Sequence, residues 1–276
     1  MKRYGCILLV MVVGAAAAAA PQAEVWPRWE AYSPDSSEVI DHGKWDRFLQ
    51  GYLIADHVSG VHRLPYGSIS RESRAGLQGY IRDMEGVEIS QYTRDEQIAF
   101  WTNLYNAVTV ELILEHYPVN SIRDIRISGP VFNRHPWDAE LVRVEGVPLT
   151  LNDIEHRIMR PIWQDPRIHF AVNCASIGCP NLQPRAFTGE TWDAMYTAAA
   201  REFINHPRGV DLSGRRPLFS SIFDWYQVDF GGSLAGVVEH VLVYAEPELE
   251  QQLREFARGG YPGRVRYEYD WDLNGL

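Results

Sequence analysis

Apolar residues recur at helical spacing along much of the chain. This pattern predicts helices over residues 45–54 and 73–84, each with apolar side chains along one face. Thr93 opens the clearest helix, because Thr93 and Glu96 form a capping-box pattern, and Pro118 ends it. Apolar residues lie on two stripes of this helix, so we expect it to be largely buried.

The second half of the chain mixes alternating and helical patterns. Residues 138–149 alternate around a Glu-Gly turn and predict a hairpin. A helix over 150–161 follows, capped by Thr150 or Asn152 and ended by Pro161. Further segments are predicted as a strand over 167–173, helices over 191–205, 233–245 and 247–257, and a final strand over 264–271.

The order of these elements indicates the fold class. A parallel sheet needs regularly alternating strands and helices, and this chain has helices, a hairpin, a helix, a strand, helices and a strand. We therefore expect an α+β fold, a mostly helical single domain around a small, mainly antiparallel sheet. The main domain covers 91–276, and residues 24–90 form an N-terminal arm and helical extension.

Residues 1–23 have the pattern of a signal peptide. Lys2 and Arg3 precede an apolar run from Cys6 to Ala20, and small residues offer cleavage near Ala20 or Ala23. The run of about 15 residues is shorter than the roughly 20 of a membrane-spanning helix. We expect an exported protein, periplasmic or secreted, without stable membrane insertion after cleavage; an uncleaved anchor is the alternative.

Export would change both charge and cysteine content. The net charge is −10 for the whole chain and becomes −12 when the two basic residues are removed. An acidic protein has no electrostatic reason to bind nucleic acid, so we exclude that partner. Cys6 would also be lost, which leaves Cys174 and Cys179 as a pair whose oxidation must be considered.

Cys174 ends the predicted strand 167–173 and is followed by small residues, among them Ser176. Such a thiol can be a nucleophile, half of a disulfide with Cys179, a metal ligand or an inert core residue. If a helical turn began there, it would lower the pKa of the thiol and aim backbone N–H groups at an oxyanion. A metal site of both cysteines and a histidine lacks the close pairs typical of zinc.

Two histidines are candidates for the base that a nucleophilic cysteine needs. His169 lies five residues before Cys174, which in a regular strand places it on the opposite face and roughly 16 Å away. His156 lies on the preceding helix, which can present it to the thiol, so we favour His156. Neighbours on a helix do not face each other, so an amide or carboxylate from another element orients His156 more easily than Glu155 does.

Asn103 and Asn106 lie within the buried helix that begins at Thr93. A buried amide without partners costs roughly 1–3 kcal/mol, so each must form specific hydrogen bonds. Either they hold neighbouring loop backbone, or one faces a reactive centre. Asn103, Asn106, Glu155 and Asp229 are therefore possible orienters of His156.

Several motifs resemble, in order, those of the domain of unknown function 547 family in its bacterial, exported branch. They are "AFWTNLYNAVTVELILEHYP", "LTLNDIEHRIMRP" and "DPRIHFAVNCASIGCPNL", and "FSSIFDWYQVDFGG" and "YDWDLN" fit too. The family pattern includes Trp101, Asn103, Asn106, Glu155, His156 and Cys174. A cysteine with an upstream histidine looks like a thiol peptidase or amidase in permuted order, which is an analogy and does not establish function.

These observations lead to two hypotheses. The first is an exported cysteine-dependent hydrolase or acyltransferase acting on an amide bond of a peptide-like or small-amide substrate. It needs no cofactor and no metal; Cys174 attacks and His156 takes and returns the proton. We place the catalytic residues at Cys174, His156, Glu155 and Asn103, and the binding residues at Trp101, Asn106, Asn173, Ser176 and His169. The second is a non-enzymatic binding domain with a structural polar network and a Cys174–Cys179 disulfide.

Overall fold

The computed structural model describes residues 21–127 and 135–276 and is mostly helical. Its α-helices are α1 (Gly43–Tyr52), α2 (Arg71–Glu85), α3 (Arg94–His116), α4 (Arg160–Trp163), α5 (Ile168–Ala171), α6 (Trp192–Asn205), α7 (Ile222–Trp225), α8 (Leu234–Leu242) and α9 (Pro247–Arg258). Short 3-10 helices are η1 (Pro27–Glu30), η2 (Tyr66–Ser68), η3 (Ile89–Gln91), η4 (Ile122–Asp124) and η5 (Pro136–Asp138), and η6 (Asp153–Met159) is a π-helix. The strands are β1 (Val142–Val144), β2 (Val147–Leu149), β3 (Val210–Asp211), β4 (Leu218–Ser220) and β5 (Arg266–Glu268).

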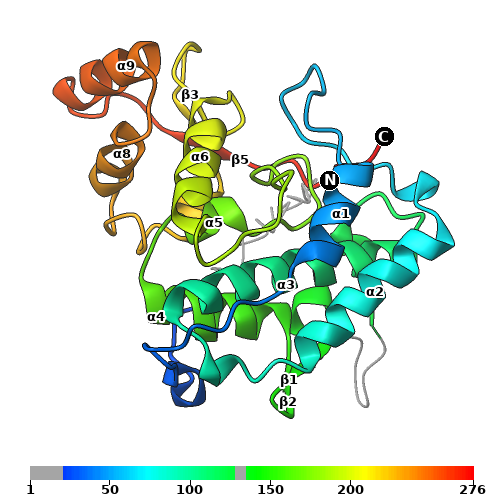
Figure 1. The fold of residues 1–276 in the computed structure, drawn as a ribbon. Helices are drawn as coiled ribbons and strands as arrows, with labels where there is room; N and C mark the ends of the chain where they lie inside the picture. The colour runs from blue at the N-terminus through cyan, green and yellow to red at the C-terminus, as the bar shows by residue number, and fades with distance from the viewer. Residues whose placement is uncertain (1–20, 128–134) are drawn as a thin grey trace, which may run out of the picture.

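The helix α3 lies at the centre of the fold (Figure 1) and is buried along most of its length. Its start was predicted correctly, because the Thr93 hydroxyl accepts the N–H of Glu96 at 3.3 Å. The other half of the capping box is not formed. Instead, the Glu96 carboxylate accepts the N–H of Ile40 at 3.0 Å, which attaches the N-terminal arm to α3.

Residues 24–90 pack into the same core as α3. Both predicted helices are confirmed, as α1 and α2, and α2 packs along α3. Trp29 of the arm meets Trp101 of α3 edge to face, with 5.2 Å between ring centroids. Before α1 begins at Gly43, the arm contains only η1.

A second buried cluster lies around α6, α8 and α9, toward the end of the molecule away from α2 (Figure 1). The helix α6 joins the two clusters, since Tyr196 packs in the first and Phe203 in the second. The predicted helices over 191–205, 233–245 and 247–257 correspond to α6, α8 and α9.

The sheets are small, and the α+β prediction is confirmed. The predicted hairpin is β1–β2, turned by Glu145 and Gly146, both with positive φ. In the other sheet β3 and β4 are antiparallel, while β4 and β5 are parallel. The predicted final strand appears as the shorter β5.

The predicted strand over 167–173 is wrong. Residues Ile168–Ala171 form one helical turn, α5, entered through Asp165 and Pro166, whose carbonyls accept the N–H groups of Ile168 and His169. A short buried apolar run does not distinguish a strand from a helix by its pattern. The consequence is large, because the turn changes the direction of His169.

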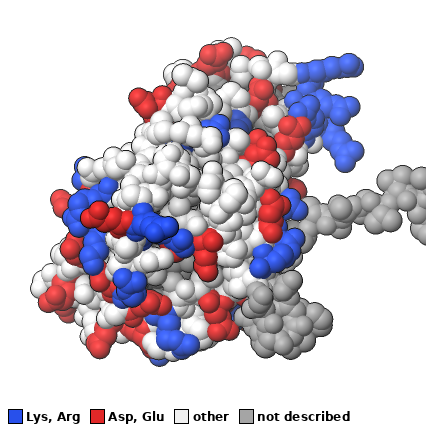
Figure 2. Space-filling view, turned by 90° about the vertical axis from the view of Figure 1, so that its right-hand side faces the viewer, with Lys and Arg blue, Asp and Glu red and all other residues white. Residues whose placement is uncertain are grey.

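Charged side chains of both signs are interspersed on the face shown in Figure 2, with uncharged surface between them. No helix within the described residues has the length and apolar character needed to cross a membrane. The predicted signal peptide, 1–23, lies almost entirely outside the described residues.

We predict that Asn103→Ala lowers the free energy of unfolding by at least about 2 kcal/mol. The amide of Asn103 donates to the Phe187 carbonyl at 2.8 Å and accepts its N–H at 3.0 Å, both buried. Each buried backbone group left without a partner costs about 1–3 kcal/mol. Urea unfolding measures the change. The exposed Asn120→Ala is the control, with an expected change within about 0.5 kcal/mol; equal effects of the two variants would contradict the prediction.

Candidate active site

Most of the side chains that could take part in a reaction line one pocket of about 560 Å³. Cys174, Glu155, His156 and His169 all line it. The remaining lining residues are mainly aromatic or polar: Pro21, Tyr105, Arg123, His135, Trp137, Asp138, Asn152, Val172, Cys179, Pro180, Ile222, Trp225, Tyr226, Tyr269 and Trp271. A largely apolar pocket with a few convergent polar groups is the usual form of a small-molecule site.

The Cys174 thiol is half-buried and has three polar neighbours. Its sulfur lies 2.8 Å from the Tyr269 hydroxyl, 3.1 Å from the Ser176 hydroxyl and 3.2 Å from the Cys179 sulfur. Both cysteines are free thiols. Within the described residues, neither histidine is among the hydrogen-bond partners of this sulfur.

The backbone after Cys174 is a turn and not a helix, so the condition for a helix N-terminus at the thiol is not met. Ala175 has φ +60°, an uncommon conformation for a residue with a side chain. It is held by hydrogen bonds of its N–H to the Asn173 side chain and of its carbonyl to the Asn274 N–H. The N–H of Cys174 donates to the Cys179 sulfur at 3.1 Å and is therefore not free for an oxyanion.

Side chains instead favour ionisation of Cys174. The hydrogen bond with Cys179, followed by those with Ser176 and Tyr269, lowers the pKa of Cys174 despite the opposing effect of burial. Burial and the neighbouring Cys174 raise the pKa of Cys179, and burial raises that of Tyr269. Cys179 and Tyr269 thus stay protonated and can donate to a Cys174 thiolate.

Glu155 and His156 lie on the π-helix η6, within the helix predicted over 150–161. Thr150 and Asp153 cap its start reciprocally. Pro161 lies inside the helix rather than ending it, and it has no N–H for the Arg157 carbonyl four residues before. The wider turn frees backbone carbonyls, which accept from the N-terminal arm: His156 from Glu24 at 3.1 Å and Arg157 from Trp26 at 3.0 Å. π-Helical turns occur frequently at functional sites.

Glu155 is a buried carboxylate among cationic and polar groups. Burial opposes its ionisation, but His156, His169 and Arg160 lower the pKa of Glu155 to about 2. Tyr105 of α3 donates to it at 3.3 Å. Contrary to the expectation for helix neighbours, Glu155 and His156 line the same pocket, with 3.9 Å between carboxylate oxygen and Nδ1.

His156 receives a hydrogen bond from Arg160, whose Nη1 lies 3.0 Å from Nδ1. Burial lowers the pKa of His156; Glu155 counteracts this and Arg160 reinforces it. Nε2 has no hydrogen-bond partner among the described residues, so it is the ring nitrogen available to a ligand. That His156 takes the proton of the thiol stays a prediction.

His169 lies in the pocket, and the expectation that it points away from Cys174's side is wrong. Its placement follows from α5, the helical turn that replaces the predicted strand. Nε2 of His169 lies 2.7 Å from Asp229 and Nδ1 lies 3.5 Å from Glu155. The ring stacks on Tyr226, with 3.9 Å between centroids. Burial opposes the ionisation of Asp229, but the hydrogen bonds from His169 and Arg160 lower the pKa of Asp229 below its ordinary value.

Asn106 and Asn173 do not line the pocket. They hold the loop that carries Cys174 and Cys179, which we call the cysteine loop. Asn106 donates to the Ala171 carbonyl at 3.0 Å and accepts the N–H of Asn173 at 2.8 Å. Asn173 in turn donates to the Pro180 carbonyl at 2.7 Å. Asn103 bonds the backbone of Phe187 and Trp101 packs against Trp29, and neither lines this pocket. Ser176 contacts Cys174 directly.

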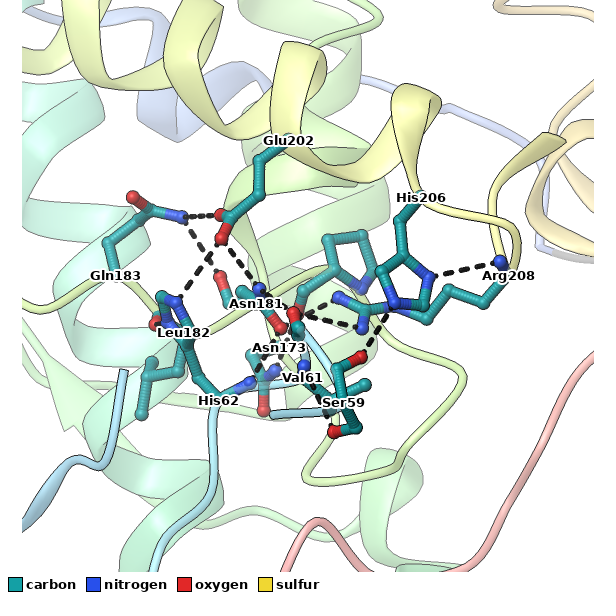
Figure 3. A network of polar contacts seen from close by, with 12 residues as sticks. Ser59, Val61, His62, Asn173, Asn181, Leu182, Gln183, Glu202, His206 and Arg208 are labelled. Atoms are coloured by element: carbon teal, nitrogen blue, oxygen red, sulfur yellow. Dashed lines mark hydrogen bonds and ion pairs between the residues drawn. The ribbon is translucent and has the colours of Figure 1, made fainter. Parts of the chain in front are cut away.

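A second polar network, not anticipated from the sequence, holds the loop after Cys179 (Figure 3). Asn181 accepts the N–H of His62 at 3.0 Å and donates to Glu202 of α6 at 2.8 Å. Arg208 donates to the same Asn181 oxygen at 2.7 Å. His62 pairs with Glu202 at 3.2 Å and bonds the Leu182 carbonyl. The cysteine loop is therefore anchored at both ends.

Trp137 and aromatic residues from the last third of the chain form one wall of the pocket. Tyr269 lies 4.9 Å from Trp225 and 4.5 Å from Trp271 between ring centroids, and Trp137 meets Trp271 at 5.8 Å. Sequence reasoning did not single out these residues, although most of them lie in the late motifs "FSSIFDWYQVDFGG" and "YDWDLN". Within the described residues, no cluster of histidine, cysteine and acidic side chains is arranged to hold a metal ion.

The fold and the site define a helical α+β domain with a thiol-bearing pocket. Residues 89–204 match the family model described as "Protein of unknown function, DUF547", which supports the family that the motifs indicated. No curated protein and no solved structure matches the chain. The matched segment carries Glu155, His156 and Cys174, whereas Trp225 and Tyr269 lie beyond it.

We predict that Tyr269→Phe raises the pKa of Cys174 by about one pH unit. A hydrogen bond to a charged group contributes about 1.5–3 kcal/mol, and one pKa unit corresponds to about 1.4 kcal/mol. The pH dependence of iodoacetamide labelling, read at Cys174 by mass spectrometry in reduced protein, measures the shift. Tyr267→Phe, two residues away on β5, is the control and should leave the profile unchanged. A Tyr269→Phe profile equal to that of the wild type would refute the thiolate contact.

Proposed function

We propose that the protein is an exported cysteine-dependent hydrolase or acyltransferase that acts on an amide or peptide bond. The observation that carries this proposal is the placement of Cys174 and His156 in one pocket. A binding domain with a purely structural polar network gives no reason for a half-buried thiol of lowered pKa to share a pocket with three histidines.

In the proposed reaction the Cys174 sulfur attacks the amide carbonyl carbon. A C–S bond forms, the C–N bond breaks, and the amine leaves with the proton that the thiol gave up. Water, or an acceptor amine in an acyl transfer, then attacks the thioester and returns the thiol. The imidazoles of the pocket are the groups suited to the proton steps.

The pocket volume and its aromatic wall suit a peptide-like or small-amide substrate. Flat apolar side chains supply contact area at low conformational cost. Arg123 lies over Trp271, 5.1 Å from the ring centroid, and lines the same pocket, so a cation is available to a polar group of the substrate.

We predict that p-nitrophenyl acetate acetylates Cys174 and that Cys174→Ser folds normally but is not acetylated at this position. The reagent is a generic acyl donor that reports a nucleophile before the natural substrate is known. Peptide mapping by mass spectrometry locates the acetyl group, and circular dichroism checks the fold. Cys179→Ala is the matched control and should retain acetylation. Nitrophenolate release at the wild-type rate by Cys174→Ser would exclude this mechanism.

The 3.2 Å contact between the Cys174 and Cys179 sulfurs favours a second candidate. If the exported protein carries this pair as a disulfide, a non-enzymatic binding domain becomes the better proposal. We predict that Cys174 in mature, unreduced protein is alkylated without added reductant, rapidly and still below about pH 7, as expected for a stabilised thiolate. Labelling that requires reductant would favour the binding domain, unless reduction also starts a catalytic activity.

A further inference from the structure

We infer that Arg160 fixes His156 as a hydrogen-bond donor to the pocket, so that His156 polarises the substrate carbonyl through Nε2–H and does not take the thiol proton. The catalytic meaning of this inference rests on the proposed function, whereas the protonation state of His156 does not. It also changes the role that the sequence suggested for His156.

The contact between Arg160 and His156 determines which ring nitrogen carries the proton. A guanidinium has only donors and stays charged in proteins. With Nη1 of Arg160 at 3.0 Å, Nδ1 of His156 must accept. In a neutral imidazole the other nitrogen then bears the hydrogen, so His156 presents Nε2–H, and not a lone pair, to the pocket.

Arg160 is held so that it cannot easily release His156. It is only 5% exposed, and its Nε donates to Asp229 at 2.7 Å. Its guanidinium lies over the Tyr226 ring, 4.9 Å from the centroid. Asp229 therefore orients His156 through Arg160, and the same carboxylate oxygen of Asp229 accepts from His169.

The charged groups around His156 are consistent with a neutral ring. Arg160 bonds Nδ1 directly, whereas the Glu155 carboxylate lies farther from it, at 3.9 Å. His169 and Asp229 form their own contact at 2.7 Å. An imidazolium at His156 would place an N–H against the guanidinium, which offers no acceptor.

A fixed N–H of His156 can take a role that the Cys174 N–H cannot take. The Cys174 N–H is used by the Cys179 sulfur and cannot stabilise an oxyanion. A neutral imidazole N–H can donate to the carbonyl oxygen as it gains charge. Because Tyr269 and Ser176 already favour the thiolate, attack does not need His156 as base.

The direct test is nitrogen NMR of full-length mature protein labelled with 15N in its histidine rings. Two-bond proton–nitrogen correlations distinguish the two neutral tautomers and the imidazolium. We expect the Nε2–H pattern for His156 at pH 7, persisting below pH 6.5. An Nδ1–H pattern or an imidazolium at pH 7 would overturn the inference, and this result needs no variant.

Variants then test the cause. Arg160→Gln should allow mixed tautomers and bring protonation of His156 to higher pH. Arg157→Gln, on the same helix, is the control and should keep the wild-type spectrum, because the Arg157 side chain pairs with Asp153 and lies over the Trp26 ring rather than bonding His156. A spectrum of folded Arg160→Gln identical to that of the wild type would also contradict the inference.

The rate of acylation of Cys174 by p-nitrophenyl acetate distinguishes a hydrogen-bond donor at His156 from a general base. His156→Ala should slow acylation about 10²–10³-fold, the usual loss for one oxyanion donor. The side-chain amide of His156→Gln can donate a hydrogen bond but cannot take a proton. This variant should be acylated at least tenfold faster than His156→Ala. Equal loss in both variants would favour the base role. An Nε2–H spectrum without acylation of wild-type Cys174 would refute the proposed function and leave the tautomer assignment standing.

Discussion

The side chain of Asn106 holds the cysteine loop against the central helix, and the rest of the site depends on this. One amide satisfies the backbone on both sides of Val172, accepting from Asn173 and donating to Ala171. Because α3 is buried along most of its length, the loop is attached to the least mobile part of the fold. Asn173 passes this constraint on to Ala175 and Pro180, so the position of Cys174 follows from the core.

The conformation of the π-helix η6, which carries His156, depends on a different constraint, the missing N–H of Pro161. Where an α-helix would close its hydrogen bonds, the π-helical turn leaves carbonyls that the backbone of Glu24 and Trp26 takes up. The same turn places Glu155 and His156 in one pocket, with Arg160 bonded to His156. The N-terminal arm is thus part of the support of the site, in addition to its packing against α3.

The pocket is assembled from two parts of the chain: the segment that matches the family model and the residues that follow it. The segment that matches the DUF547 family supplies the thiol, the acid and the histidines. The following residues supply Asp229, which holds Arg160 and His169, and the aromatic wall with Tyr269. A chain ending at the matched segment would lack both the anchor of Arg160 and one donor to Cys174.

The sequence by itself determined the elements whose signals are local. Thr93 and Pro118 bound α3, the Glu-Gly turn defines the β1–β2 hairpin, and both asparagines of α3 could be recognised as needing specific partners. These features depend on caps, turns and helical periodicity, which act over a few residues. The family motifs also identified Glu155, His156 and Cys174 together.

Only the tertiary structure decided what those residues contact. The apolar run before Cys174 fits a strand or a helix equally well, and the turn at Asp165 and Pro166 made it α5, which brought His169 into the pocket. The partner of His156 is set by the burial of Arg160 against Asp229 and Tyr226, which both lie nearly 70 residues after Arg160 in the sequence. Hydrogen-bond partners at such separation depend on packing, and no local pattern encodes them.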